Sequence, residues 1–256
     1  MSTDPPADPR PPSSSAAPQR VLLMATHLAL RDAREKNIYN KLKSRSFVHT
    51  PVLDNVFLGE TGMATEFNTI FQFFGWSSFA SITKLGSKFL IIEFLSTLQL
   101  TQTGVYFRLF TQEFFLTWRV LSDLLGFPSN ARLDLLEALK DFDTHKFWIE
   151  ISKEPFFHDN RTRDIEHPTL RFLHKWLGIA FFPRDDASKI RVIDLQLIYE
   201  AVKKIRVSPV HALVDHGLSI PNYKVGDVAI CSIVTHLAFK LKLIVGASLD
   251  FIDTHR

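Results

Sequence analysis

The chain has 256 residues, of which 46% are hydrophobic and 23 are Phe, so it can bury a substantial aromatic-rich core. Its single cysteine, Cys231, excludes an internal disulfide and a thiolate zinc cage, and such sparing use is typical of an intracellular protein. The net charge of +3 is uneven, because residues 31–45 carry +4 and residues 46–256 carry −1. No signal peptide or membrane-spanning run is expected, so we expect no membrane partner.

The amino-terminal part divides into two segments. Residues 1–20 hold six of the thirteen Pro, a composition typical of a disordered tail. Residues 21–46 form a basic segment, predicted to be helical, with an apolar first half and a basic second half. It is either a solvated helix that leads into the domain or an arm that contacts nucleic-acid phosphates. The contact residues in the second interpretation are Arg31, Arg34, Lys36, Lys41, Lys43 and Arg45.

Helical periodicity dominates residues 47–251, which we predict to be one mainly α, compact multi-helix domain with a small antiparallel β-hairpin inserted. The expected helices cover residues 64–74, 88–98, 133–140, 144–152, 168–180, 194–203, 210–218 and 227–243. Local chemistry sets several of their ends: Gly75 follows the first, Ser87 can cap the second, and Pro168 fits a first helical position.

Residues 104–128 predict a hairpin that runs directly into a short helix. The strands 105–110 and 113–117 are expected to pair with Leu109 opposite Phe114 across a four-residue loop, because Thr111-Gln112 is a poor two-residue turn. Side chains alternate along a strand, so one face of the hairpin is apolar and the other is mixed and partly covered. The apolar face holds Val105, Phe107, Leu109, Phe114, Leu116 and Trp118.

The helix after the hairpin has both of its ends specified. Thr117 is expected to cap it, and its apolar stripe comprises Val120, Leu121, Leu124 and Leu125. Gly126 suits the left-handed position after the last turn, Phe127 is expected to fold back on Leu121, and Pro128 prevents continuation. We therefore assign a packing role to Leu109, Phe114, Leu121, Leu124, Gly126, Phe127 and Pro128.

Searches for catalytic and metal-binding patterns find none. The chain lacks GxSxG, a phosphate-binding loop, a Rossmann glycine set, HExxH and CxxC. His167 and His174 are seven residues apart, and His211 and His216 are five apart; neither is a usual single-face ligand spacing. We expect no enzymatic activity, no metal and no cofactor.

The remaining charged residues are predicted to have structural roles. The acid pairs Asp141 with Asp143 and Asp185 with Asp186 flank helices, so caps or solubilising charge are expected. Arg108 on the mixed hairpin face is interpreted as a partner of Glu113 or, alternatively, as a contact residue.

Five blocks in fixed order resemble a known family. They are IEFLSTL at 92–98, FRLF at 107–110, LLGFP at 124–128, FWIEIS at 147–152 and IEHPTLRFLHKWL at 165–177. Together they resemble the Gag-region, first-open-reading-frame protein of Athila-type plant LTR retrotransposons, over roughly residues 51–245. The hairpin–helix unit is also distantly similar to the plant mobile domain.

The resemblance implies a helical, non-enzymatic domain with a Gag-like role in particle assembly or RNA packaging. The chain lacks the CCHC zinc knuckle by which Gag proteins usually bind nucleic acid, and it lacks protease, reverse-transcriptase and integrase motifs. The leading hypothesis is a structural or interaction protein that associates with itself or a host protein. The alternative is a protein that binds RNA or DNA through residues 31–45.

Overall fold

The structure is a computed structural model that describes residues 20–51, 54–133, 139–223, 226–245 and 247–252. It confirms a mainly helical fold with a small antiparallel sheet. Residues 1–19 of the predicted tail and residues 134–138 of the predicted helix at 133–140 lie outside the described residues. Within the described part, no helix is both long and apolar enough to cross a membrane.

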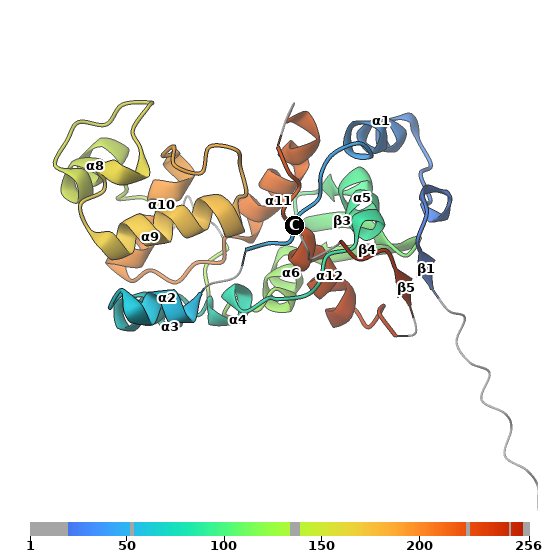
Figure 1. Ribbon diagram of the computed structural model, residues 1–256, viewed down its shortest axis with the longest axis horizontal. Coiled ribbons are helices and arrows are strands. Elements are labelled where there is room, and N and C mark those ends of the chain that lie inside the picture. Colours follow the sequence, from blue (N-terminus) through green and yellow to red (C-terminus); the bar gives the residue numbers. More distant parts are fainter. Residues whose placement is uncertain (1–19, 52–53, 134–138, 224–225, 246, 253–256) are drawn as a thin grey trace, which may run out of the picture.

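The molecule has two halves, which Figure 1 shows side by side. The right-hand half brings the first and last described strands together beside the three-stranded sheet. It contains β1 Val21–Leu22, η1 Ala25–His27, α1 Ala33–Leu42, α5 Lys88–Thr97, β2 Gln99–Leu100, β3 Gly104–Leu109, β4 Gln112–Thr117, α6 Trp118–Leu124, α11 Val210–Ser219, η4 Ile220–Asn222, α12 Cys231–Lys240 and β5 Ser248–Leu249. The left-hand half contains α2 Asn55–Glu60, α3 Ala64–Phe74, α4 Ser77–Ala80, α8 Thr144–Ser152, η2 Thr162–Asp164, α9 Pro168–Trp176, the π-helical turn η3 Leu177–Phe181 and α10 Val192–Lys203.

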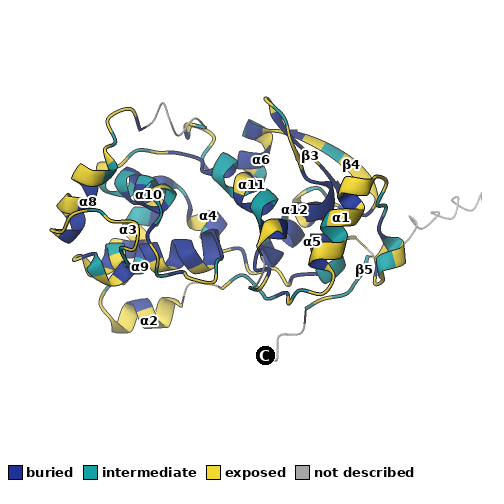
Figure 2. Ribbon diagram, turned by 90° about the horizontal axis from the view of Figure 1, so that it is seen from above, coloured by how far each residue is buried: buried dark blue, intermediate teal, exposed yellow. Residues whose placement is uncertain are grey.

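Aromatic rings join the two halves. Trp76 stacks on Phe181 with ring centroids 5.2 Å apart and also contacts Phe127, 5.9 Å away. Phe127 stacks on Phe79 at 5.0 Å, and the Trp76 indole donates a hydrogen bond to the carbonyl of Val207. These rings are buried, as the dark segments of Figure 2 indicate for the middle of the molecule. The Phe-rich composition therefore supplies the seam between the halves.

Several helix ends lie where local chemistry places them. Helix α3 spans Ala64–Phe74 as predicted and ends at Gly75, whose φ of +70° is left-handed. Helix α8 also has its predicted bounds, and α9 begins with Pro168 and continues through η3. Helix α5 begins directly after Ser87, although the Ser87 side chain makes no cap hydrogen bond. The order of apolar, glycine and proline residues in the sequence was therefore sufficient to predict these helix boundaries.

The hairpin has the predicted apolar face but a different register. Strands β3 and β4 pair with Leu109 opposite Gln112 and Phe107 opposite Phe114, so the expected Leu109–Phe114 pairing is wrong by two residues. A shift of two residues keeps every side chain on its predicted face, whereas a shift of one would invert the hairpin.

The register differs because the turn is shorter than expected. Phe110 and Thr111 form a two-residue turn with φ of 54° and 64°, a conformation that neither residue readily adopts. The buried Glu93 side chain on α5 compensates, because its two carboxylate oxygens accept the backbone N–H groups of Phe110 and Thr111, each at 2.7 Å. Burial raises the pKa of Glu93, while these two amides and Arg108 act in the opposite direction.

The helix after the hairpin follows its predicted ends. Thr117 accepts the backbone N–H of Val120, and Gly126 has a φ of +82°. A side chain at Gly126 would meet Cβ of Ser78 at 2.8 Å, so both conformation and space favour glycine. The prediction that Val120 belongs to the apolar stripe of this helix is wrong, because Val120 is 44% exposed. Leu121 is buried.

Two predicted helices are shorter than expected because distant segments pair with their ends. Residues 21–45 are α-helical only in α1, apart from the short 3-10 helix η1, since Val21–Leu22 forms a parallel pair with Ser248–Leu249. Helix α12 begins at Cys231 rather than residue 227, because Val228 is extended beside Phe47. Helix α10, by contrast, begins two residues before the expected Asp194.

The Glu93 contact to the turn can be tested directly. Glu93→Gln replaces one accepting oxygen with an amide donor, so one turn N–H loses its partner and the free energy of unfolding should fall by about 1–3 kcal/mol. Chemical denaturation measures the change.

A second substitution at the same turn should act in the opposite direction. Thr111→Gly removes a β-branched side chain from a left-handed position and should raise the free energy of unfolding by up to about 1 kcal/mol. A destabilised Thr111→Gly chain would contradict the turn conformation.

Candidate anion-binding groove

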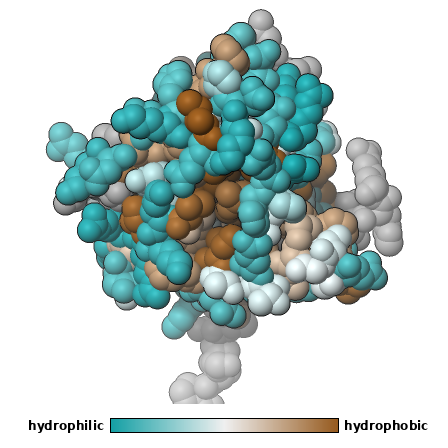
Figure 3. Space-filling model, turned by 90° about the vertical axis from the view of Figure 1, so that its left-hand side faces the viewer, coloured by the Kyte–Doolittle hydropathy of each residue, from teal (hydrophilic) through white to brown (hydrophobic). Residues whose placement is uncertain are grey.

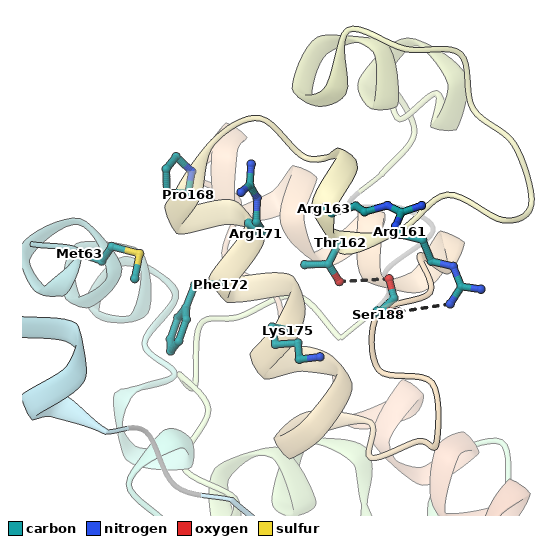
Figure 4. Close-up of a pocket in the computed structure, with 9 residues that line it drawn as sticks. All are labelled: Met63, Arg161, Thr162, Arg163, Pro168, Arg171, Phe172, Lys175 and Ser188. Carbon is teal, nitrogen blue, oxygen red and sulfur yellow. Dashed lines mark hydrogen bonds between the residues drawn. The ribbon is translucent and has the colours of Figure 1, made fainter. Parts of the chain in front are cut away.

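An open groove of about 840 Å³ lies on the left-hand half, between α9, the start of α3 and the segments around η2 and residue 188. Four basic side chains line it together with five other residues: Met63, Arg161, Thr162, Arg163, Pro168, Arg171, Phe172, Lys175 and Ser188. Figure 4 shows Arg171, Phe172 and Lys175 along α9, with Met63 on one side and the η2 residues on the other. We call it the basic groove.

The charges of the basic groove are only partly neutralised. Arg161 is paired with Asp186, whose pKa is lowered to about 2 by hydrogen bonds from Ser188 and Arg161. Arg163 is 85% exposed and lies 3.6 Å from Asp164.

Along α9, neither Arg171 nor Lys175 forms an ion pair with a carboxylate among the described residues. Arg171 donates to the backbone carbonyl of Ile165 at 2.7 and 3.0 Å, and this neutral acceptor leaves the guanidinium charge uncompensated. Lys175 is exposed one turn further along α9, on the same face. The groove therefore presents net positive charge to solvent.

One wall of the basic groove is apolar and aromatic. Phe172 packs edge-on against Phe67 at 5.1 Å and stacks with Phe57 of α2 at 5.8 Å. Phe57 remains 43% exposed. Figure 3 faces this end of the molecule and shows apolar residues in a recess framed by hydrophilic ones. An exposed ring beside cations suits a ligand with both a flat apolar group and negative charge.

A buried polar network anchors the η2 side of the groove. The Thr162 hydroxyl lies 2.8 Å from Nδ1 of His174, and Nε2 of His174 lies 3.4 Å from Asp194. Asp194 also accepts from Arg184 at 2.7 Å and from Arg191 at 3.0 Å. Burial alone would raise the pKa of Asp194, but His174 and the two arginines hold it well below its usual range.

This hydroxyl, imidazole and carboxylate act as an anchor rather than as a nucleophilic centre. His174 and Asp194 are completely buried, and the Thr162 hydroxyl is also 3.1 Å from the carbonyl of Ser188. The packing denies a substrate access to the imidazole of His174 and the carboxylate of Asp194, although Thr162 itself lines the groove. Sequence reasoning missed the network because its members come from three separate segments.

The predicted contact residues of the basic segment are largely engaged within the chain. Arg34 donates to the carbonyl of Leu98 at 2.6 Å, and Arg45 donates to the carbonyls of Ile220 and Gly226. Arg31 pairs with Glu113, and Lys41 lies 3.4 Å from the Asn222 side chain. Within the described chain, the ammonium groups of Lys36 and Lys43 form neither a hydrogen bond nor an ion pair, although that of Lys43 lies 5.8 Å from the centroid of the Tyr39 ring. None of the six cations lines the basic groove.

Arg108 proves to be buried rather than a surface contact. It pairs with Glu35 of α1, which is also buried, and it donates to the carbonyl of Ala29 at 2.6 Å. The expected partner Glu113 lies further away, at 3.9 Å. The Arg108–Glu35 pair therefore fastens α1 to the sheet.

The histidines and acid pairs are dispersed among structural contacts. No group of three potential metal ligands occurs in the part of the chain that the structure describes. His211 stacks on Trp118 at 3.8 Å, and Asp143 caps α8 through the N–H of Lys146. Burial raises the pKa of the Cys231 thiol, which keeps it protonated.

Two other buried groups titrate outside their usual ranges. Glu200 is fully buried, neither of its carboxylate oxygens has a hydrogen-bond partner among the described residues, and burial raises its pKa to about 9. Burial, together with the charges of Arg191 and Arg184, lowers the pKa of His216 to about 4. Both groups are therefore neutral near pH 7 in the folded chain.

Comparison with known proteins gives one family. Residues 26–207 match the model of the ATHILA ORF-1 family, and this span includes all five sequence blocks. Neither the curated proteins nor the solved structures give a match.

Glu200 should make the stability of the chain fall as pH rises. Between pH 4.5 and about 9 the folded chain retains a proton on Glu200 that the unfolded chain has released. Each pH unit in that window then removes up to about 1.4 kcal/mol from the free energy of unfolding. Denaturation of Glu200→Gln between pH 5 and 8, within this window, should lack this slope.

The matched control is Glu60→Gln, which alters an exposed acid of α2 and should keep the wild-type slope. Parallel curves for wild type and Glu200→Gln would show that Glu200 is ionised in the folded chain.

Proposed function

The chain belongs to the ATHILA ORF-1 family of Gag-like retrotransposon proteins, and from this premise we propose that it is a non-enzymatic structural protein that binds RNA through the basic groove. We place it inside the cell, where the RNA of a mobile element is packaged. The observation that carries the proposal is the convergence of Arg161, Arg163, Arg171 and Lys175 on one groove with an aromatic wall.

The basic groove fits a single strand better than a small anion. Its volume of about 840 Å³ exceeds what one phosphate group fills, and its cations lie on both sides of the opening. Arg171 and Lys175 follow one face of α9, so they can contact successive phosphates of an extended strand. The exposed Phe57 ring next to Phe172 offers a stacking surface that accepts any base. We therefore expect binding with little sequence preference.

The buried network gives the groove a fixed shape. Thr162 holds η2 through His174, and Arg161 and Arg163 flank Thr162 on either side in the chain. Cations held by ordered backbone lose less conformational entropy on binding than those of a mobile tail.

Residues 31–45 are a second candidate for nucleic-acid contact. Lys36 and Lys43 on or next to α1 are both exposed, and the ammonium group of Lys36 neither donates a hydrogen bond nor forms an ion pair among the described residues. The two candidate surfaces belong to different halves of the molecule, so substitutions distinguish them.

Self-association is the other part of the Gag-like proposal. The observation that favours it is the pair of exposed rings on the sheet, Tyr106 at 48% and Phe115 at 41%. Light scattering over a wide concentration range tests it, and a strict monomer throughout would count against assembly.

The salt dependence of RNA binding tests the basic groove. The double variant Arg163→Gln with Lys175→Gln removes two exposed cations. It should weaken binding to single-stranded RNA and reduce the slope of log K against log salt by roughly 1.4, about 0.7 for each lost phosphate contact. Fluorescence anisotropy at several salt concentrations measures both quantities.

The matched control is Lys36→Gln with Lys43→Gln, which makes the same change in net charge on the other half of the molecule. It should keep the wild-type slope. The opposite pattern would assign RNA binding to the basic segment, and equal, unchanged slopes in both variants would exclude the groove.

A further inference from the structure

Strand β4 forms an open edge of the sheet. The strand order is β2-β3-β4, and β4 pairs only with β3 among the described residues. Because Leu109 and Gln112 close a two-residue turn, Gln112, Phe114 and Leu116 exchange backbone bonds with β3. The N–H and C=O groups of Glu113 and Phe115 therefore point away from the sheet.

This edge lacks most of the features that usually prevent strand pairing, and its one charged residue is Glu113. Strand β4 contains no Pro, Lys or Gly, and its ladder with β3 continues without a bulge from Gly104–Thr117 to Leu109–Gln112. Natural edge strands are commonly protected by such residues or by bulges. A regular six-residue strand whose alternate backbone groups point outward forms a template for another strand.

An exposed aromatic pair lies beside the open edge. Tyr106 and Phe115 face each other on the outer face of the sheet with ring centroids 4.7 Å apart. Helix α1 covers the neighbouring part of this face through the buried Arg108–Glu35 pair but leaves the two rings exposed. The apolar area therefore continues up to the edge.

We propose that β4 pairs antiparallel with β4 of a second copy of this chain, about a two-fold axis at Phe115. This inference rests on the assembly part of the proposed function and is independent of RNA binding. Phe115 then exchanges both backbone hydrogen bonds with Phe115 of the second copy, and the two three-stranded sheets become one six-stranded sheet.

The sequence of β4 is complementary to itself in this register. With Phe115 opposite Phe115, Glu113 of one copy faces Thr117 of the other, and the two Tyr106–Phe115 pairs form one aromatic cluster. A register centred on Glu113 would instead place two carboxylates opposite each other, which is destabilising. This complementarity favours a second copy over an unrelated strand.

Sedimentation equilibrium tests the pairing. Wild-type chain should dimerise in a concentration-dependent manner. Phe115→Lys should raise the dimer Kd roughly tenfold or more, because it removes two rings and places like charges at the axis. The control Val120→Lys adds the same charge at an exposed apolar position of α6 and should keep the wild-type Kd. Thermal denaturation verifies that both variants are folded.

A cross-link tests the position of the axis. In Phe115→Cys the two introduced thiols lie opposite each other in a hydrogen-bonded pair, with about 5.5 Å between their Cα atoms, a separation that a disulfide spans. Oxidation should give a covalent dimer, and the native Cys231 is buried and should not react. The control Val120→Cys should remain monomeric under the same conditions.

The outcomes separate this inference from the proposed function. A monomeric wild-type chain would overturn both the β4 pairing and assembly. A dimer that resists Phe115→Lys and does not cross-link through Phe115→Cys would overturn the β4 pairing alone. The Phe115→Lys chain should bind RNA as a monomer, with the same slope of log K against log salt for each chain as the wild type. That result would support the independence of the two surfaces.

Discussion

The buried carboxylate of Glu93 is the contact on which much of this fold depends. It accepts the two amides of a turn whose residues both have positive φ, and so it stabilises a backbone conformation that Phe110 and Thr111 would otherwise disfavour. The turn fixes the register of β3 and β4, and the register fixes where Thr117 begins α6. Helix α6 then ends at Gly126, which directs Phe127 into the aromatic seam between the two halves. The Glu93 side chain on α5 therefore stabilises the turn from which the chain continues through β4 and α6 to Phe127.

Buried polar groups elsewhere also determine geometry rather than chemistry. The Arg108–Glu35 pair fastens α1 to the sheet, and Asp194 joins α9 and α10 through His174 and two arginines. An unpaired buried charge is costly, so each of these networks favours one arrangement of its elements over alternatives. The second network also orders the segment that carries Arg161 and Arg163. The buried contacts of Thr162 thus hold Arg161 and Arg163 in place along the basic groove.

The two surfaces that we assign to binding lie in different halves of the molecule. The basic groove is beside α9, and the β4 edge belongs to the sheet (Figure 1). In the proposed dimer, pairing through β4 would leave the grooves of both copies open, so that the dimer would be able to hold two stretches of one RNA strand. The second contact is then intramolecular, which raises the overall affinity without any new contact within a groove. The proposed assembly and the proposed RNA binding therefore use different residues, so substitutions can test them separately.

The amino-acid sequence by itself determined the features that depend on neighbouring residues. The bounds of α3 and α8, the proline that begins α9, the Thr117 cap and the left-handed Gly126 all follow from contacts within a few residues. The inward face of the hairpin also followed, because a period of two survives a two-residue shift in register. The tertiary structure alone decided what distant segments contribute. Glu93 made the short turn possible, residues 248–249 drew Val21–Leu22 into a strand, and the four cations of the basic groove meet only because the chain returns to α9. Such contacts join residues far apart in the sequence, and no local periodicity encodes them.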